Sequence, residues 1–223
     1  MTPQTDHTVQ TDRTTVKRLA DRGRYDRAEV NAILDEAYVC HVGMVVDGSP
    51  VVIPTLHARV GDHLILHGSP ASRMLRGATR QEVCVTVTLV DGFVLARSAF
   101  HHSVNYRSVV VLGQAEPVPE AEKEAVLDAL VNKLVPGRLP LLRPTTAKEL
   151  KSTSVVRLPI TEASAKVRTG PPIDDDEDYE LPIWAGVVPV TVTYGAPVTD
   201  PNSRLEVEVP AHVTALQQGL SGT

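Results

Sequence analysis

Serine and arginine side chains that could bind a phosphate gather where an apolar run ends. The stretch Leu64-Ile-Leu-His67-Gly68-Ser69-Pro70-Ala-Ser72-Arg73 predicts a strand, a Gly-Ser turn and the start of a helix. N–H groups at a helix start lack intrahelical partners, and Ser69, Ser72 and Arg73 would add hydroxyl donors and a fixed positive charge. The layout therefore indicates a phosphate-binding turn. The alternative is a serine helix cap without a ligand, which is common at such junctions.

A second group of polar residues interrupts an apolar strand. Asn105, Arg107 and Ser108 stand in the run from Val104 to Gly113, and burying such groups unpaired costs about 1–3 kcal/mol each. Alternation places Asn105 and Arg107 on one face of this strand and Ser108 on the other. These side chains therefore face either solvent or a ligand. Pro54, in the middle of another strand, likewise indicates an edge, a bulge or a close ligand.

Other chemistries find no matching pattern. The histidines show no HExxH spacing, and the acidic run at 174–178 lacks the central glycine and terminal glutamate of a calcium loop. We therefore expect no metal site, and a solvated turn at the acidic run. A GxGxxG turn and a GxxxxGK[ST] loop are both absent from the sequence, which excludes the Rossmann and P-loop nucleotide folds.

Composition favours a soluble globular protein. The 223 residues are 42% hydrophobic, no apolar run approaches the roughly 20 residues of a membrane span, and no secretory leader is recognisable. Cys40 and Cys84 stand in apolar runs, as buried free thiols of a reducing compartment do, so we expect a cytoplasmic protein. The net charge of −5 and the absence of a basic stripe argue against nucleic acid as a partner.

The predicted elements are mostly strands in succession. Asp26 predicts the start of a helix, and Asp47-Gly48 predicts a hairpin between strands 38–46 and 51–60. Further strands are expected at 63–67, 82–90, 93–99, 104–117, 155–160, 163–168 and 187–194, with a turn at Asp91-Gly92. Helices are expected from Pro70, over 119–134 and 145–151, and from Pro210. This succession predicts a mainly β fold, a barrel with flanking helices, in one domain over 16–223 with a C-terminal extension. Residues 1–15 are predicted to be a disordered arm.

Several strings resemble the flavin-nucleotide-binding proteins related to pyridoxamine 5′-phosphate oxidase, which include the nitroimidazole-resistance-type proteins. These strings are Arg22-Gly-Arg-Tyr-Asp26-Arg, Val52-Ile-Pro-Thr55, Leu66-His67-Gly68-Ser69 with Ser72-Arg73, His102-Ser-Val-Asn105-Tyr106-Arg107-Ser108, Ala165-Lys-Val-Arg168-Thr-Gly-Pro-Pro and Glu177-Asp-Tyr179-Glu-Leu-Pro-Ile-Trp184. The resemblance implies a split barrel, a homodimer, and one FMN in each of two clefts between the subunits.

The resemblance also assigns roles to residues. Backbone groups of Val52, Ile53, Pro54 and Thr55 would line the isoalloxazine ring, and His67, Ser69, Ser72 and Arg73 would hold the phosphate. Asn105, Arg107 and Ser108 would reach the flavin from a neighbouring strand, and Trp184 would cover the ring. The sequence departs from the oxidases where Arg73-Met74 replaces Arg-Lys, and the vitamin-specific C-terminal arginine segment is missing, so turnover of pyridoxamine phosphate is not expected.

The expected function is that of an FMN-dependent oxidoreductase with a small-molecule electron donor and a small acceptor such as a nitro compound or a quinone. Because a flavin carries the redox chemistry itself, no catalytic residue is assigned. The alternative is a protein that holds FMN or haem without turnover, with a strand-borne histidine as axial ligand of the haem.

Overall fold

The structure is a computed structural model, and it describes residues 8–217. Ten strands form one sheet: β1 (Gly23–Arg24), β2 (Val39–Val46), β3 (Ser49–Val60), β4 (His63–Gly68), β5 (Val83–Leu95), β6 (Ser103–Gly113), β7 (Glu116–Pro117), β8 (Ser154–Pro159), β9 (Ala163–Arg168) and β10 (Gly186–Pro189). Every strand pair is antiparallel, in the order β1-β9-β6-β5-β2-β3-β4-β8-β7, and β10 pairs with β5.

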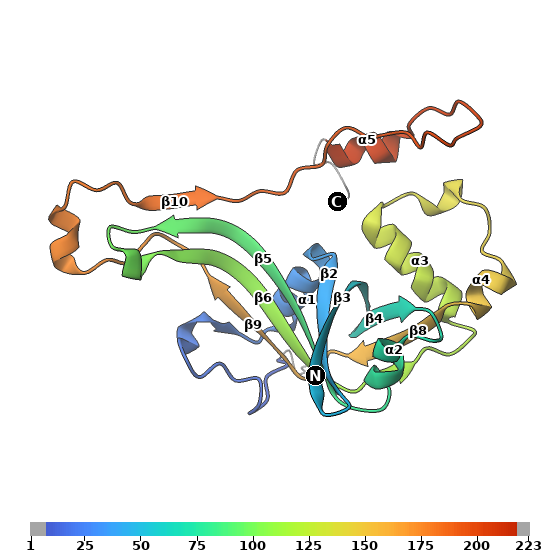
Figure 1. Cartoon of the computed structure of the whole chain (residues 1–223), viewed down its shortest axis with the longest axis horizontal. Coiled ribbons are helices and arrows are strands. Elements are labelled where there is room, and N and C mark those ends of the chain that lie inside the picture. The colour runs from blue at the N-terminus through green and yellow to red at the C-terminus, as the bar shows by residue number, and fades with distance from the viewer. Residues whose placement is uncertain (1–7, 218–223) are drawn as a thin grey trace, which may run out of the picture.

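Within residues 8–217, five α-helices and four short 3₁₀ turns accompany the sheet, and Figure 1 shows how they are arranged around it. They are α1 (Arg27–Glu36), α2 (Arg73–Ala78), α3 (Lys123–Leu134), α4 (Ala147–Lys151), α5 (Ala211–Gln217), η1 (Ala20–Arg22), η2 (Ala99–His101), η3 (Leu139–Leu141) and η4 (Asp176–Glu180). The curved antiparallel sheet with its flanking helices is a split barrel, which confirms the predicted fold class. Among residues 8–217 we find no helix with the length and apolarity needed to cross a bilayer.

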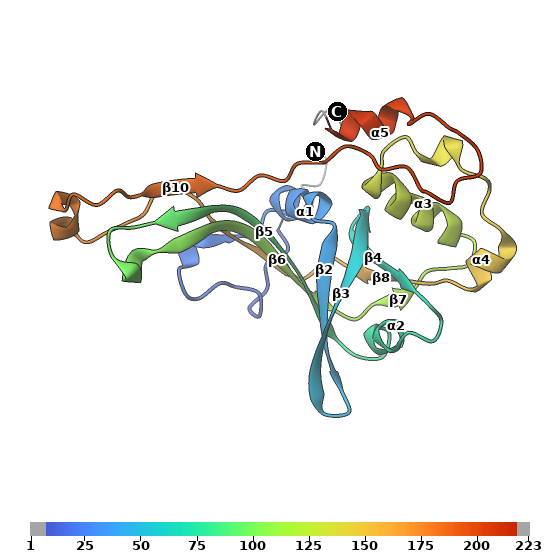
Figure 2. The same cartoon turned by 45° about the horizontal axis from the view of Figure 1, so that its top comes forward.

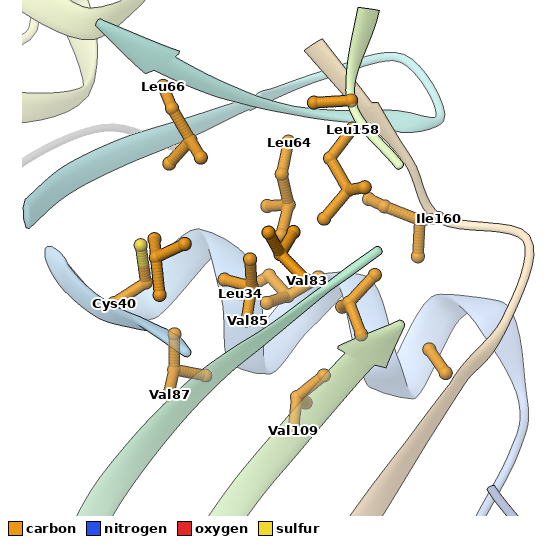
Figure 3. Close-up of a cluster of buried hydrophobic side chains, with 14 of the residues drawn as sticks. Leu34, Cys40, Leu64, Leu66, Val83, Val85, Val87, Val109, Leu158 and Ile160 are labelled. Atoms are coloured by element: carbon orange, nitrogen blue, oxygen red, sulfur yellow. The ribbon is translucent and has the colours of Figure 1, made fainter. Parts of the chain in front are cut away.

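Two apolar clusters hold the sheet and the helices together. The larger one fills the inside of the curved sheet, where Leu34 of α1 meets Cys40, Leu64, Val85 and Leu158 (Figure 3). A smaller cluster lies on the other face, where Val126 and Leu130 of α3 pack on Ala58, Ile65 and Val155. Helix α1 therefore packs on the inner face over β3, β5, β6 and β9, whereas α3 packs on the outer face over β3 and β4.

Local signals placed the first helix and the first hairpin correctly. The Asp26 side chain accepts hydrogen bonds from the N–H groups of Ala28 and Glu29, and α1 begins at the next residue. Asp47 and Gly48 both have positive φ, 50° and 78°, as a two-residue hairpin turn with the twist of its strands requires. The β2–β3 hairpin is thereby confirmed.

The predicted turn at Asp91-Gly92 is wrong. β5 continues through both residues, and the register against β6 shifts there as in a β-bulge. A Cβ on Gly92 would lie 3.0 Å from a side-chain carbon of Val187 and 3.1 Å from the carbonyl oxygen of Val188. The glycine therefore admits β10, which lies along β5 in Figure 1, instead of turning the chain.

The predicted disordered arm is also wrong for residues 8–15, while residues 1–7 lie outside the described residues. Val9 is buried in the main cluster, and its backbone bonds to Tyr25 and Ala163. Arg13 forms ion pairs with Glu82 and Glu162. The segment is polar in composition, but its single valine and its charged side chains find partners far along the chain.

The C-terminal part contains less regular structure than predicted. The strand expected over 187–194 ends at Pro189, whereas α5 begins next to Pro210 as expected. Between them, residues 190–210 run past the sheet toward α3 without a regular element (Figure 2). Tyr194 holds this segment to the body through a hydroxyl–hydroxyl bond of 2.6 Å to Tyr38.

Candidate functional site

The sheet opens between β3 and β4. Residues 49–56 of β3 pair with β2 on one edge, and only residues 57–60 pair with β4 on the other. Beyond Leu66, β4 continues with β8, while the β2–β3 hairpin runs away from it (Figure 2). Within the described residues no strand pairs with the second edge of 49–56, so its backbone N–H and C=O groups are open to a ligand. We call this opening the seam.

The residues predicted to contact the flavin ring lie on one side of the seam, and those predicted to contact the phosphate lie on the other side. Val52, Ile53, Pro54 and Thr55 form the β3 side, with Val52 and Pro54 exposed and Ile53 packed on the core. His67 and Ser69 follow on the other side, where β4 ends and the chain enters α2. The structure therefore brings both groups to one opening.

The hydroxyl groups near α2 already accept hydrogen bonds from the backbone. Ser72 caps α2 by accepting from the N–H of Leu75, and Ser69 accepts from the N–H of Ala71. Each hydroxyl still has its own O–H to donate to a ligand. Burial lowers the pKa of His67, so its ring is neutral at pH 7 and would bind an anion only as an N–H donor.

Three arginines supply the positive charge near α2, and position 74 adds no cation. Met74, which replaces the lysine of the oxidases, is 5% exposed and belongs to the core. Arg73, Arg76 and Arg80 line a hollow of about 370 Å³ together with Val45 and Asp47. None of the three forms an ion pair within residues 8–217. Arg73 and Arg76 share one face of α2 at i, i+3 spacing, and Arg80 follows the end of the helix.

Asn105, Arg107 and Ser108 are engaged within the chain. The Arg107 guanidinium donates to the carboxylates of Glu36 and Asp91, and these two carboxylates raise its pKa. Asn105 is buried and bonds to Arg168 and to the carbonyl of Gly170. Ser108 donates 3.3 Å to the carbonyl of Lys166 on the opposite, outer face. Polar residues in this strand therefore have protein partners, which the sequence could not reveal.

Trp184 lies far from the seam of its own chain. It is 67% exposed and stands between η4 and β10, beside the outer end of the β5–β6 hairpin. Figure 1 places this hairpin end and α2 at opposite sides of the molecule. A single chain therefore does not bring Trp184 to the seam.

The outer face of β2, β5 and β6 lacks a cover in the described residues. It presents apolar side chains from three strands and β3, among them Val39, Val45, Val52, Val90, Val110 and Leu112, with Cys84 between them. The most exposed of the valines named here is Val52, at 62%. A face of this kind on a soluble protein usually marks a contact with another chain. We call it the open face.

The histidines differ in their exposure and in their neighbours. The ring of His57 is fully buried, its Nε2 lies 2.9 Å from the carbonyl of Leu34, and burial lowers its pKa to about 4. His41 is exposed on the open face, opposite Pro54 of β3 and Thr86 of β5. At the far end of the sheet, His101 comes within 4.8 Å of Asp175 and Asp178, a grouping that the sequence did not predict. Exposed acidic groups often gather without an ion, and we assign no metal there.

The seam holds exposed backbone, hydroxyl donors and cations, and it contains none of the hydrogen-bonded nucleophile–base pairs of covalent catalysis among the described residues. Such a site can bind and orient an anionic ligand, and the reaction then depends on chemistry that the ligand brings. The fold and the seam together define a split-barrel protein that binds a nucleotide-like cofactor.

Comparison with known proteins agrees with this class. The family model described as pyridoxamine 5′-phosphate oxidase matches residues 26–167, and the chain belongs to that family. Among solved structures, the chain is similar to the flavocytochrome Anf3 from Azotobacter vinelandii, with 46% identity and a TM-score of 0.87 over 92% of this chain and 96% of that one. No curated protein matches the chain.

Two further structures extend the likeness. The FAD and haem binding protein from Mycobacterium smegmatis is 39% identical, with a TM-score of 0.84 over 88% of this chain and 97% of that one. A protein of Bacteroides thetaiotaomicron described as a 5-nitroimidazole antibiotic resistance protein is 24% identical, with a TM-score of 0.53 over 64% of this chain and 84% of that one. This third likeness concerns the fold alone.

Proposed function

We propose that the protein is a homodimeric flavin-dependent oxidoreductase that also binds haem and passes electrons from a small-molecule donor to a small acceptor. The observation that carries this proposal is the match, over nearly the full length of both chains, to a flavocytochrome and to an FAD and haem binding protein. The names of both proteins combine a flavin with a haem group. The two cofactors that the sequence offered as alternatives are therefore proposed together.

The seam fits a flavin nucleotide. A flat ring system with polar edges needs backbone donors and acceptors, and residues 49–56 offer an unpaired strand edge. Its phosphate needs positive charge and hydroxyl donors, which Arg73, Arg76, Ser69 and Ser72 supply. In this assignment the flavin supplies the hydride and electron chemistry, and the chain holds the ring along β3 and the phosphate beside α2.

A second copy of the chain would complete the site. It would cover the open face, where Val39, Val45 and Val52 are exposed. The symmetry of a dimer would also allow Trp184 of one copy to approach the seam of the other, which one chain cannot do alone. The resemblance of the sequence to a family with clefts between subunits supports the same arrangement.

Haem requires an axial ligand, and strand-borne histidines meet this need unequally. His57 is closed to an iron because its ring is buried and its Nε2 bonds to the carbonyl of Leu34. His41 stands exposed among apolar side chains of the open face, where a dimer would enclose it. His67 is half-buried with a lowered pKa, and a neutral imidazole is the form that ligates haem.

Anaerobic reduction followed by an acceptor tests the proposed activity. Protein loaded with FMN or FAD and with haem should be reduced by a reduced nicotinamide or by dithionite, and a quinone or nitro compound should reoxidise it over repeated turnovers. The variants His41→Ala and His67→Ala identify the axial ligand, since the variant that removes it should lose the haem absorption band while keeping the flavin. A loaded protein that no acceptor reoxidises would refute the oxidoreductase proposal.

A further inference from the structure

A second group of cations lies at the other end of the sheet from the seam. A hollow of about 300 Å³ opens where the N-terminal segment runs beside β9 (Figure 1). One wall is formed by η1 and β1, and the other by the end of β9 and the loop that follows it. The lining residues are Asp21, Arg22, Arg24, Val167, Arg168, Thr169, Pro171 and Ile173. We call this hollow the arginine pocket.

Arg168 at its base is 7% exposed, and the acceptors that it contacts among residues 8–217 are neutral. Its guanidinium donates to the side-chain oxygen of Asn105 and, at 3.5 Å, to the carbonyl of Pro171. Asn105 is itself fixed, because its amide nitrogen donates 3.1 Å to the carbonyl of Gly170. The guanidinium is therefore held in place without a counter-ion, and within residues 8–217 no carboxylate lies within 4.0 Å of it.

The other charges of the pocket do not balance Arg168. Arg22 forms no ion pair within the described residues, and Arg24 lies 3.8 Å from Glu29 while donating to the carbonyls of Asp21 and Gly23. Asp21 is the one acidic residue among the lining side chains. Burial, and then the positive charge of Arg22, lower the pKa of Arg168. Burying a cation without a counter-ion is destabilising, and an anion that enters the pocket would offset this cost.

We propose that the arginine pocket binds the oxyanion group, phosphate or carboxylate, of a small molecule that also has an apolar part. Guanidinium groups suit such an anion because their planar N–H donors match two oxygens at once. Val167, Pro171 and Ile173 give the pocket an apolar side, and Ile173 is exposed beside it. The pocket is separate from the seam in its own chain, since β1 and β9 lie at one end of the sheet and β3 and β4 toward the other. The site goes beyond the proposed function.

Titration of the protein as purified with two probes tests this site and distinguishes the two oxyanions. Phenyl phosphate and benzoate, compared by calorimetry at constant ionic strength, share an apolar ring and differ in the anionic group. Arg22→Gln should weaken the probe that binds at least 10-fold, and Arg22→Glu should abolish binding, because the new carboxylate would itself pair with Arg168. Arg204→Gln, which removes an exposed arginine elsewhere, is the matched control for net charge and should bind as wild type does.

Arg22 is partly exposed and forms no ion pair within residues 8–217, so both variants should unfold at the temperature of the wild type or above it. Binding of phenyl phosphate alone or of benzoate alone would name the group that the pocket prefers, and binding of both would support the shared site. If neither probe binds the wild type, or if Arg22→Glu binds a probe as tightly as wild type, the proposal is wrong. Flavin absorbance measured on the same samples reports on the seam separately.

Discussion

The buried ring of His57 links the stability of the protein to pH. Its pKa is lowered to about 4 in the folded chain, from 6.5, mainly by burial and then by the positive charge of Lys133. Between these two values the unfolded chain binds more protons than the folded one, so stability falls as the pH falls from 6.5 toward 4. At about 1.4 kcal/mol per pKa unit, the loss is on the order of 3 kcal/mol.

Urea unfolding at a series of pH values measures this loss. We expect His57→Gln to flatten the dependence between pH 6.5 and 4, because glutamine does not titrate and its amide can still donate to the carbonyl of Leu34. A smaller slope should remain, since burial also lowers the pKa of His67. His102→Gln changes an exposed histidine and serves as the control. An unchanged slope in His57→Gln would show that this ring does not set the acid sensitivity.

Single residues also show where sequence reasoning reaches its limit. Asp47-Gly48 and Asp91-Gly92 are the same dipeptide, and only the first makes a turn. The difference depends on β10, which lies nearly 100 residues further along the chain and packs over Gly92. Arg107 likewise has its partner Glu36 71 residues away. Local signals predict the hairpin and the helix starts, whereas these contacts between distant segments follow from the fold.

At the scale of elements, the central feature is the separation of β3 from β4. The sequence predicted both strands and the polar turn after them, because alternation and turn residues are local. It could not predict that β4 pairs along its whole length with β8, a strand about 90 residues later, and with β3 only over residues 57–60. The site residues on β3 and near α2 could therefore be predicted from the sequence, whereas the seam between these two elements could not.

The seam predicts which part of a flavin nucleotide each element binds. Arg73→Ala should weaken FMN binding about 10-fold, and Arg73→Ala with Arg76→Ala should weaken it further, because the arginines share the phosphate charge. Riboflavin has no phosphate, and its affinity should stay within about twofold in every variant. Fluorescence titration of apoprotein measures both ligands, and Arg18→Ala removes an exposed arginine as control. Equal FMN affinity in the double variant and the wild type would place the phosphate elsewhere.

At the scale of the whole molecule, the open face predicts a dimer. Light scattering should give twice 24.1 kDa, since a second copy would cover the apolar residues of β2, β5 and β6. Thr88 is exposed on β5 within this face, and Thr88→Asp would place a charge in the apolar contact. We expect this variant to be monomeric and to lose most of its flavin.

Leu141→Asp tests whether the Thr88 effect is specific to the face. Leu141 is an exposed apolar residue of η3, away from the open face, and its change should leave the mass and the flavin content unaltered. The thermal unfolding of Thr88→Asp reports whether the monomer still folds. A folded Thr88→Asp monomer with full flavin content would contradict a site that needs both copies.

The visible spectrum of the protein as purified tests the central claim most directly. If the protein is a flavohaem oxidoreductase, the spectrum should contain flavin absorbance together with a Soret band, and chemical quantification should find both cofactors in a constant ratio to the chain. Added reductant should bleach the flavin and shift the haem bands in the same sample. A purified dimer that contains neither chromophore, and takes up neither flavin nucleotide nor haem when they are supplied, would contradict the account.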